Sequence, residues 1–409
     1  MTDHDEAGAN VGDELEQRGL VRILHSGAAG GITLTLGLVA GVTWASLDPS
    51  GYATAVATPV HLPLVPSSEV DSIGSLITNL AMIVFFFAIG LEVARERTLG
   101  VLADNRTAAL PVIAAIGGMA GAAIIYLGIV AALGPQGAAG GWGIPMATDI
   151  AFTLGALSLL GSNVPSSVRV FLLALAVADD VLSVVILAIV GQEHTGSSTL
   201  RLVLAAAGVI VVCVGLIVAR RRRAPWPTFV AAGLILWWCL ASLGIEPTLA
   251  GVIAGIAAPF SHRASSPGVT LERWMVPASA YVVLPAFALV AGGVDLVSFH
   301  LGSTSGLFTA VLGARVLGKL IGITGAVALA IRLGLGTLPD RSKWRHMGGA
   351  AVLCGIGFTV PLLFAHSAFG TDPTLLATTK VALLVASLLC GILGLAILVM
   401  GSSRRSEHG

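Results

Sequence analysis

The most regular feature of the chain is the alternation of long apolar stretches with short polar connections. Most of these stretches have the roughly 20 residues that an α-helix needs to cross a bilayer. The pattern therefore predicts an all-α polytopic membrane protein with twelve transmembrane helices. The predicted segments are residues 29–47, 72–94, 108–133, 141–160, 168–190, 202–219, 226–243, 247–260, 276–297, 305–331, 347–367 and 374–400.

Composition supports this fold class. The chain has 409 residues, of which 56% are hydrophobic, 11% are charged and 51 are glycines. Small residues let helix backbones approach closely in lipid. The formal net charge is zero, so no nucleic-acid partner is predicted, and no motif indicates a cofactor. We expect a cytoplasmic segment over residues 1–28, a single transmembrane domain over 29–400 and a cytoplasmic tail over 401–409.

Basic residues are concentrated in alternate connections. With twelve segments, 18 of the 22 Lys and Arg residues fall on the side that carries both termini, Arg201 falls on the other side, and three lie inside segments. Cytoplasmic loops of membrane proteins carry an excess of Lys and Arg. We therefore predict that both termini are cytoplasmic in a multi-pass protein of the plasma membrane.

One long connection on the opposite side, residues 48–71, has no basic residue. Its Val, Thr and Pro residues are compatible with a short hairpin or with an irregular loop. Of these two alternatives we expect the irregular loop.

Two adjacent carboxylates, Asp179 and Asp180, lie in the middle of the apolar segment 168–190. A charged group at this depth is costly, and it persists only where it faces protein, water or a cation. Because adjacent helical positions point about 100° apart, the two side chains should not be equivalent. The pair predicts an ion or proton site near the middle of the membrane.

Two predicted helices contain residues that interrupt helical structure near mid-span. Pro disfavours helical conformation in the residue before it, and Gly weakens a helix. Each interruption alone could be a simple kink, but they fall in the middle of segments three to five and of segments ten to twelve. Matching interruptions in two three-helix units predict inverted-topology repeats with two crossing interrupted helices. The interrupting residues are Pro145, Thr148 and Asp149 in the first helix and Gly355, Gly357, Thr359 and Pro361 in the second.

Interrupted helices expose partial charges, positive at amino ends and negative at carboxyl ends. Asp149 is placed to neutralise the positive ends. For the negative ends we expect Lys319, which lies at the centre of segment 305–331 and should also pair with a carboxylate. Arg315 precedes Lys319 by four residues on the same helical face, but the sequence indicates no definite role for it.

Several stretches of the chain are similar to motifs of the bacterial NhaA-type sodium/proton antiporters. They are FFFAIGLEVARE (85–96), LPVIAAIGGM (110–119), IPMATDIAFTLGALSLLGSNVP (144–165), LALAVADDV (173–181), TLAGVIAG (248–255), GKLIG (318–322) and AVLCGIGFTVP (351–361). The resemblance implies a fold of twelve helices with inverted repeats. It also implies a secondary transporter, and no enzyme, that exchanges intracellular Na⁺ or Li⁺ for external H⁺ across the bacterial inner membrane. Such a protein would serve sodium and pH homeostasis, with a homodimer left open.

The resemblance also implies roles for individual residues. Asp180 matches the main cation-binding carboxylate, and Asp179 matches the acid that pairs with the lysine at Lys319. Thr148 and Asp149 match the break of the first discontinuous helix. The residues that match positions linked to pH sensing are Glu92, Arg95, Glu96, Glu272 and Glu246, the last standing where some members have a histidine.

Competition for one site is sufficient for exchange, because the same carboxylate oxygens hold either a proton or a small hard cation. We predict that Asp180 binds the cation with help from Asp179 and Thr148. Asp179 is expected to alternate between a salt bridge to Lys319 and a cation-bound or protonated state. If two protons move per Na⁺, transport carries net charge and responds to voltage by roughly 2.3 kcal/mol per charge per 100 mV.

Other interpretations of the same residues predict different features. A buried aspartate pair can simply bridge helices, and an intramembrane aspartyl protease would need the two aspartates on separate helices. A channel would need a filter or a ring of charge, and a symporter of an organic solute would need a larger polar pocket. Glu92 and Glu96 beside Arg95 fit a solvated charge cluster as well as a pH sensor.

Overall fold

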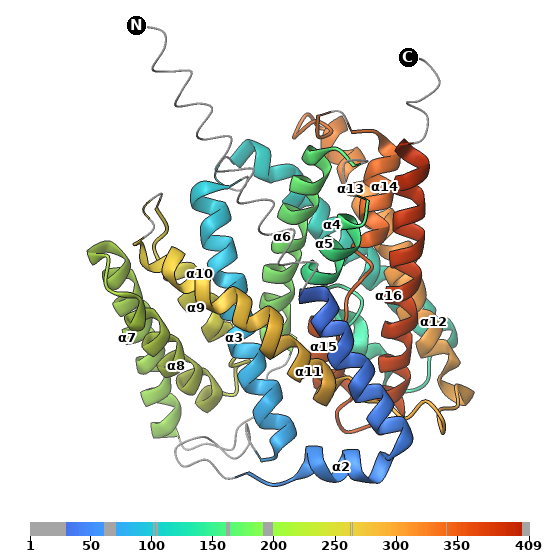
Figure 1. Cartoon of the computed structure of the whole chain (residues 1–409), viewed down its shortest axis with the longest axis horizontal. Helices are drawn as coiled ribbons and strands as arrows, with labels where there is room; N and C mark the ends of the chain where they lie inside the picture. Colours follow the sequence, from blue (N-terminus) through green and yellow to red (C-terminus); the bar gives the residue numbers. More distant parts are fainter. Residues whose placement is uncertain are drawn as a thin grey trace, which may run out of the picture.

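The computed structural model describes residues 30–60, 71–100, 103, 105–160, 164–190, 199–261, 263, 265–340 and 342–402. Over these residues the protein is helical, and an isolated antiparallel bridge between Pro59 and Ser72 is the β-structure found among them. The all-helical fold class is therefore confirmed. Figure 1 shows the helices gathered in one bundle, with α7 (Thr199–Arg222) and α8 (Trp226–Leu243) at one edge and α16 (Pro373–Ser402) near the opposite edge.

Within the described ranges, nine helices are long and apolar enough to cross a membrane. Two of them are composite helices that contain a π-helical turn. Besides α7, α8 and α16, the nine are Gly30–Leu47, α3 (Ile73–Leu99), α4 (Asn105–Leu133), α6 (Ser166–Val190), the composite of α10 (Pro267–Ala278), η4 (Ser279–Val283) and α11 (Leu284–Ala291), and the composite of η5 (Gly302–Thr304), α12 (Ser305–Gly313), η6 (Ala314–Gly318) and α13 (Lys319–Arg332).

The remaining three predicted segments contain shorter helices. They are η2 (Ala138–Gly143) and α5 (Ile150–Ser158) in the fourth, α9 (Leu249–Ala257) in the eighth, and α14 (Trp344–Leu353) and α15 (Thr359–Phe369) in the eleventh. Each predicted segment thus contains helical residues, but these three lack a continuous helix of spanning length. The count of twelve crossings stays a prediction.

The expectation of an irregular loop over residues 48–71 is wrong for the first part of that connection, which forms α2 (Pro49–Ala57). The Asp48 side chain accepts a hydrogen bond from the Gly51 backbone N–H at 2.9 Å, and Pro49 occupies the first helical position. Both features favour the start of a helix. In Figure 1, α2 lies across the ends of the longer helices. Residues 61–70 of this connection lie outside the described residues.

Helix α6 lies in the interior of the molecule. One group of buried apolar side chains, which includes Leu173 and Val177, joins α6 to α3, α12 and α15. A second group, which includes Leu172 and Leu175, joins α6 to α4, α13 and α14. In the most apolar window of each helix, 72% of α6 residues are buried, compared with 11% of α7 residues. Protein therefore surrounds the middle of α6, where the two aspartates lie, whereas α7 is left to face lipid.

Glycines bring α4 and α13 close together beside α6. A Cβ atom on Gly121 of α4 would lie 2.6 Å from the carbonyl oxygen of Gly318, so the two backbones are in direct contact. Such contacts are typical of helix pairs in membranes. The next residue after Gly318 is Lys319, whose Cδ atom would lie 3.5 Å from a Cβ atom on Gly118. The lysine side chain therefore runs over a glycine surface of α4.

Candidate functional site

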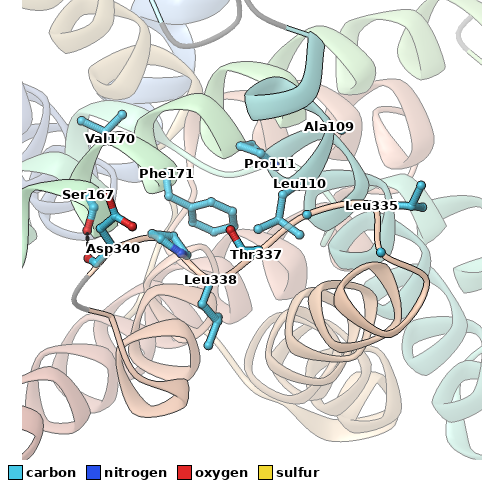
Figure 2. Close-up of a pocket in the computed structure, with 13 residues that line it drawn as sticks. Ala109, Leu110, Pro111, Ser167, Val170, Phe171, Leu335, Thr337, Leu338 and Asp340 are labelled. Carbon is cyan, nitrogen blue, oxygen red and sulfur yellow. Dashed lines mark hydrogen bonds between the residues drawn. The ribbon is translucent and has the colours of Figure 1, made fainter.

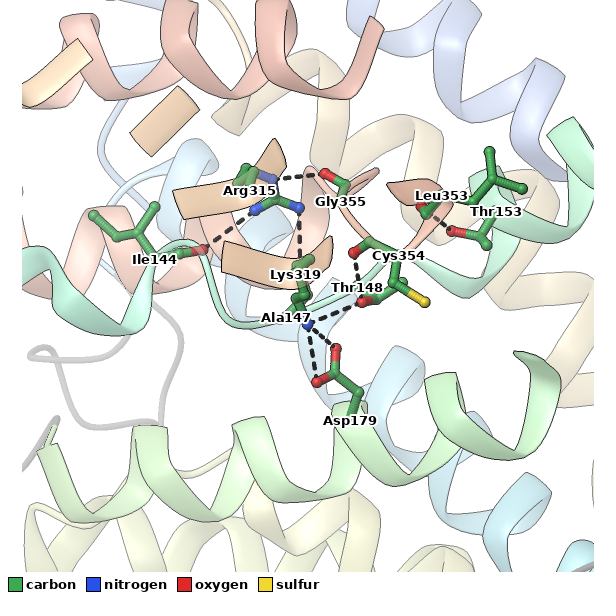
Figure 3. Close-up of polar contacts among 10 residues, drawn as sticks. All are labelled: Ile144, Ala147, Thr148, Thr153, Asp179, Arg315, Lys319, Leu353, Cys354 and Gly355. Carbon is green, nitrogen blue, oxygen red and sulfur yellow. Dashed lines mark hydrogen bonds and ion pairs between the residues drawn. The ribbon is translucent and has the colours of Figure 1, made fainter. Parts of the chain in front are cut away.

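Asp179 and Lys319 form an ion pair in the interior of the protein. Lys319 Nζ lies 2.9 Å from Asp179 Oδ2 and 3.1 Å from Oδ1, and both side chains are fully buried. Lys319 Nζ also donates a hydrogen bond to Thr148 Oγ1 at 3.2 Å. Figure 3 shows Lys319 reaching both Thr148 and the carboxylate of Asp179 on α6. Removal of one partner would leave an uncompensated buried charge, which typically costs about 3–5 kcal/mol.

Asp180 is equally buried but has different surroundings. Its exposed fraction is 1%, and its Oδ1 atom has no hydrogen-bond partner in the part of the chain that the structure describes. The hydrogen bonds of Lys319 go to Asp179 instead. One carboxylate is therefore paired, and the other presents a buried oxygen without a partner.

The two interrupted segments meet at their breaks. Residues 144–149 separate η2 from α5, and residues 354–358 separate α14 from α15. Thr148 Oγ1 donates to the carbonyl oxygen of Cys354 at 2.8 Å, and the Asp149 N–H donates to that of Ile356 at 2.9 Å. These hydrogen bonds tie the first break directly to the second. The predicted interrupting residues that lie inside the breaks include Pro145, Gly355 and Gly357.

Asp149 lies at the amino ends of two half-helices. It immediately precedes α5, and its Oδ2 atom accepts a hydrogen bond at 3.0 Å from Thr359 Oγ1, on the first residue of α15. A carboxylate at a helix amino end opposes the positive partial charge there. This is the position expected of a residue that neutralises those ends.

Arg315, and not Lys319, contacts the carboxyl ends of the interrupted helices. Its guanidinium donates from Nε to the carbonyl oxygen of Gly355 at 2.8 Å, from Nη1 to that of Ile144 at 3.3 Å and from Nη2 to that of Ala147 at 3.1 Å (Figure 3). Lys319 donates to Asp179 and Thr148, so its part in neutralising these ends stays a prediction. A planar guanidinium with five donors can hold several carbonyl groups at once, which suits this position better than an ammonium group.

Sequence reasoning missed Ser387, which supports the second break. Ser387 Oγ accepts a hydrogen bond from the Gly357 N–H at 3.2 Å and donates one to the Gly357 carbonyl oxygen at 3.1 Å. Gly357 was predicted only as a helix breaker, yet a Cβ atom at this position would also overlap the Arg315 guanidinium. Ser387 lies in a plain apolar helix without a motif, so the sequence carried no signal for its role.

Comparison with known proteins identifies the family. A profile of the family described as Na⁺/H⁺ antiporter 1 matches residues 21–398. The chain belongs to this antiporter family. Three relatives are proteins named Na(+)/H(+) antiporter NhaA. That of Sodalis glossinidius is 37% identical over 392 residues, which are 93% of this chain and 94% of the relative. That of Escherichia coli O1:K1 / APEC is 38% identical over 381 residues, 92% of this chain and 96% of the relative. That of Albidiferax ferrireducens is 39% identical over 388 residues, 93% of this chain and 97% of the relative.

Membership of the family has direct consequences. The antiporter is a secondary transporter and not an enzyme, and Na⁺ and H⁺ are its substrates. Its apolar helices and its family make it a multi-pass membrane protein.

Four of the five residues of the antiporter that match pH-sensing positions lie together where α3 meets α10. Arg95 Nη2 lies 3.0 Å from Glu96 Oε1, and Arg95 Nε lies 3.3 Å from Glu272 Oε1, so that these three residues join α3 to α10. Glu92 is half-buried one turn earlier in α3, close enough to Arg95, Glu96 and Glu272 to interact with them electrostatically. Glu246 precedes α9 in the sequence, whereas Glu272 follows it in α10.

A cavity of about 840 Å³ lies apart from the aspartates. Figure 2 shows it between the first turns of α4 and α6 and the connection from α13 to α14. The lining is largely apolar, with Leu110, Phe171 and Leu338, and Asp340 is its ionisable member among the described residues. The lining of this cavity includes neither aspartate of α6 nor Lys319. The cavity is therefore separate from the candidate ion site.

The described residues contain no group of three or more His, Cys, Asp or Glu side chains that could hold a metal ion. The oxygen atoms at the site come instead from two aspartates and from neighbouring hydroxyl groups. Oxygen ligands suit a small hard cation, and a transported ion must be bound weakly enough to leave again.

Proposed function

We propose that the antiporter exchanges Na⁺ or Li⁺ for H⁺ because cation and protons compete for Asp179 and Asp180. One observation carries this proposal: the buried Oδ1 atom of Asp180 lacks a partner next to the Asp179–Lys319 ion pair. Buried polar atoms are nearly always hydrogen-bonded, so each exception requires an explanation, such as an ion or proton bound in another state.

In the proposed cycle, Asp180 is the first ligand of an entering cation. Asp179 then leaves Lys319 and becomes the second ligand. Its carboxylate oxygens cannot pair with the Lys319 ammonium group and coordinate the entering cation at the same time. Thr148, whose hydroxyl accepts a hydrogen bond from Lys319 before the cation enters, becomes a third. As the cation binds, Asp180 and the freed Lys319 each release a proton. Protons that re-enter the site bind to Asp180 and Lys319, displace the cation and restore the ion pair between Lys319 and Asp179. Asp149 and Arg315 stay in contact with the half-helix ends throughout the cycle.

We propose that the exchange is electrogenic. Two carboxylates and one lysine meet at the site, so more than one proton can leave for each Na⁺ that enters. Net charge would then cross the membrane in each cycle, and the membrane potential would drive it.

The proposed architecture is one transport domain over residues 29–400 with twelve crossings, in which segments three to five and ten to twelve form inverted repeats. Support comes from the interruptions in the fourth and eleventh segments and from the hydrogen bonds that join them. The distribution of Lys and Arg supports cytoplasmic termini in the bacterial inner membrane. The homodimer stays an expectation from the resemblance.

We propose that pH regulation acts through the contact between α3 and α10. Arg95 on α3 pairs with Glu272 on α10, so protonation of Glu272 would weaken the contact between these two helices. Glu246 lies in the connection before α9, where it accepts a hydrogen bond from Thr248 Oγ1 at 3.0 Å.

The proposed function is tested by Na⁺-induced dequenching of a ΔpH probe in everted membrane vesicles. Asp180→Asn keeps the shape of the side chain but removes its negative charge. We expect the apparent affinity for Na⁺ to fall about tenfold or more, the order of effect expected when a charged ligand is lost. Asp340→Asn, which changes an exposed carboxylate away from the site, is the matched control. Unchanged proton movement in Asp180→Asn would remove Asp180 from the mechanism.

A further inference from the structure

A second buried oxygen without a partner lies beside Asp180 on α6. Ser183 is fully buried, and its Oγ atom makes no hydrogen bond with any residue that the structure describes. A serine within a helix commonly points to solvent or donates to the carbonyl oxygen four residues earlier. Ser183 does neither, and it is not hydrogen-bonded to Asp180.

Helix geometry places Ser183 between the two aspartates. Successive residues of a helix are rotated by about 100° around its axis. Viewed down α6, Asp180 is therefore about 100° from Asp179, and Ser183 is about 40° from Asp179 in the same direction. Ser183 is also the i+4 neighbour of Asp179 and the i+3 neighbour of Asp180, and residues at these spacings adjoin each other on a helix surface. The three side chains therefore adjoin one another on one part of α6.

A buried hydroxyl without a partner is unfavourable, so Ser183 should acquire a partner at another stage of transport. The two buried cations nearby do not supply it, since Lys319 and Arg315 donate to other groups. A small hard cation between the aspartates would supply it, because hydroxyl and carboxylate oxygens are the ligands such cations prefer.

We propose that Ser183 is a further ligand of the transported cation. This inference rests on the proposed function of Asp179 and Asp180. Unlike a carboxylate, the hydroxyl neither gains nor loses a proton during exchange. It therefore strengthens the binding of Na⁺ without strengthening the binding of H⁺, and so helps to set the balance between the two substrates.

The test measures the half-saturating Na⁺ concentration at several pH values in proteoliposomes. Ser183→Ala removes the oxygen, whereas Ser183→Cys retains a side chain of similar size but replaces a hard oxygen with a soft sulfur. In both variants we expect the half-saturating concentration to rise about fivefold, as for the loss of one polar contact to a buried charge. The factor should be the same at each pH, because proton binding is unchanged.

Thr379 provides the matched control. It is also fully buried, and its Oγ1 atom has no partner within the described residues, but it lies on α16. Thr379→Val should leave the half-saturating concentration unchanged. An unchanged value in both Ser183 variants would contradict the proposal, and so would an equal effect in Thr379→Val. Failure of both Ser183 variants to assemble would assign Ser183 to the fold and reject the ligand role.

Asp180→Asn, measured in parallel, separates this inference from the proposed function. If Asp180→Asn is impaired and both Ser183 variants behave as wild type, only the role of Ser183 is rejected. If Asp180→Asn transports as wild type, the aspartate site itself is rejected.

Discussion

Asp179 and Asp180 occupy successive positions of α6, yet of these two carboxylates only Asp179 accepts hydrogen bonds from Lys319 among the described contacts. Helical periodicity was sufficient to predict that the two carboxylates differ, because adjacent positions point about 100° apart. It could not predict which of them faces Lys319, since that depends on how α6 packs against α4 and α13. The family resemblance supplied this assignment, and the ion pair agrees with it.

Replacement of Lys319 should affect stability and coupling together. Lys319→Ala leaves Asp179 as a buried charge without its partner, and we expect a loss of about 3–5 kcal/mol in the free energy of unfolding. We also expect fewer protons to move per Na⁺, because one proton-carrying group has been removed. Thermal unfolding in detergent and the H⁺/Na⁺ ratio in proteoliposomes measure the two effects. Lys319→Arg retains the charge but cannot release a proton, so it should preserve stability while lowering the H⁺/Na⁺ ratio. An H⁺/Na⁺ ratio unchanged in Lys319→Ala would reject the exchange role of the salt bridge.

The residues around the site were predictable when they belonged to a motif or broke a pattern. Thr148 and Asp149 interrupt an apolar helix, and Lys319 is a charge where none is expected. Ser183 and Ser387 are small polar residues in apolar helices, which are common and carry no distinctive signal. Ser387 is notable because it hydrogen-bonds to Gly357, and Ser183 because its buried hydroxyl has no partner among the described residues. Only the folded structure shows these contacts.

At the scale of the elements, the two interrupted helices share a single set of contacts. Arg315 donates to the first break at Ile144 and Ala147 and to the second at Gly355. Arg315 lies in the π-helical turn η6, and such turns are frequent at functional sites. The sequence revealed a cation on the face of Lys319, but it could not reveal that two distant segments bring their carbonyl groups to it.

We predict that the guanidinium shape of Arg315 is required. Arg315→Lys keeps the charge but cannot reach three carbonyl groups at once, so stability should fall by about 1.5–3 kcal/mol for each charge-assisted hydrogen bond lost. Gly357→Ala should act in the same way, because its Cβ atom would displace the guanidinium. Thermal unfolding of the single and double variants tests this, and the two effects should not add, since both remove the same contacts.

The control for this prediction is Gly348→Ala in α14. A Cβ atom on Gly348 would lie 4.0 Å from the nearest atom, Cδ1 of Leu320, so the change is tolerated sterically. Full additivity of Arg315→Lys and Gly357→Ala, or equal destabilisation by Gly348→Ala, would contradict the shared contact.

Helix α2 illustrates a limit of composition-based reasoning. The Val, Thr and Pro residues of segment 48–71 suggested extended or irregular structure, but the first nine residues after Asp48 form a helix. A local signal was present in the sequence, because Asp48 followed by Pro49 is a typical helix start. The capping pattern at Asp48 and Pro49 is a more specific signal than the average propensity of the residues that follow.

At the scale of the whole molecule, hydrophobic pattern and length were sufficient to predict an all-helical membrane protein. The pattern could not predict that α6 is enclosed between two groups of buried side chains while α7 is largely exposed, since both helices are apolar. That difference matters for function, because a carboxylate pair is tolerated only where protein or water surrounds it. The arrangement of helices thus encloses the two costly residues in protein, as the proposed exchange site requires.

The account depends on one claim, which is that Na⁺ and H⁺ occupy the aspartates in alternation. The most direct measurement adds Na⁺ to the purified protein in weakly buffered solution and records the protons released, while Na⁺ binding is followed with a radioactive isotope. We predict that Na⁺ binding releases protons in the wild type. At the same Na⁺ concentration, both signals should be strongly reduced in Asp180→Asn, as expected from its lower affinity. Binding of Na⁺ to the wild type without release of H⁺ at any pH would contradict the account.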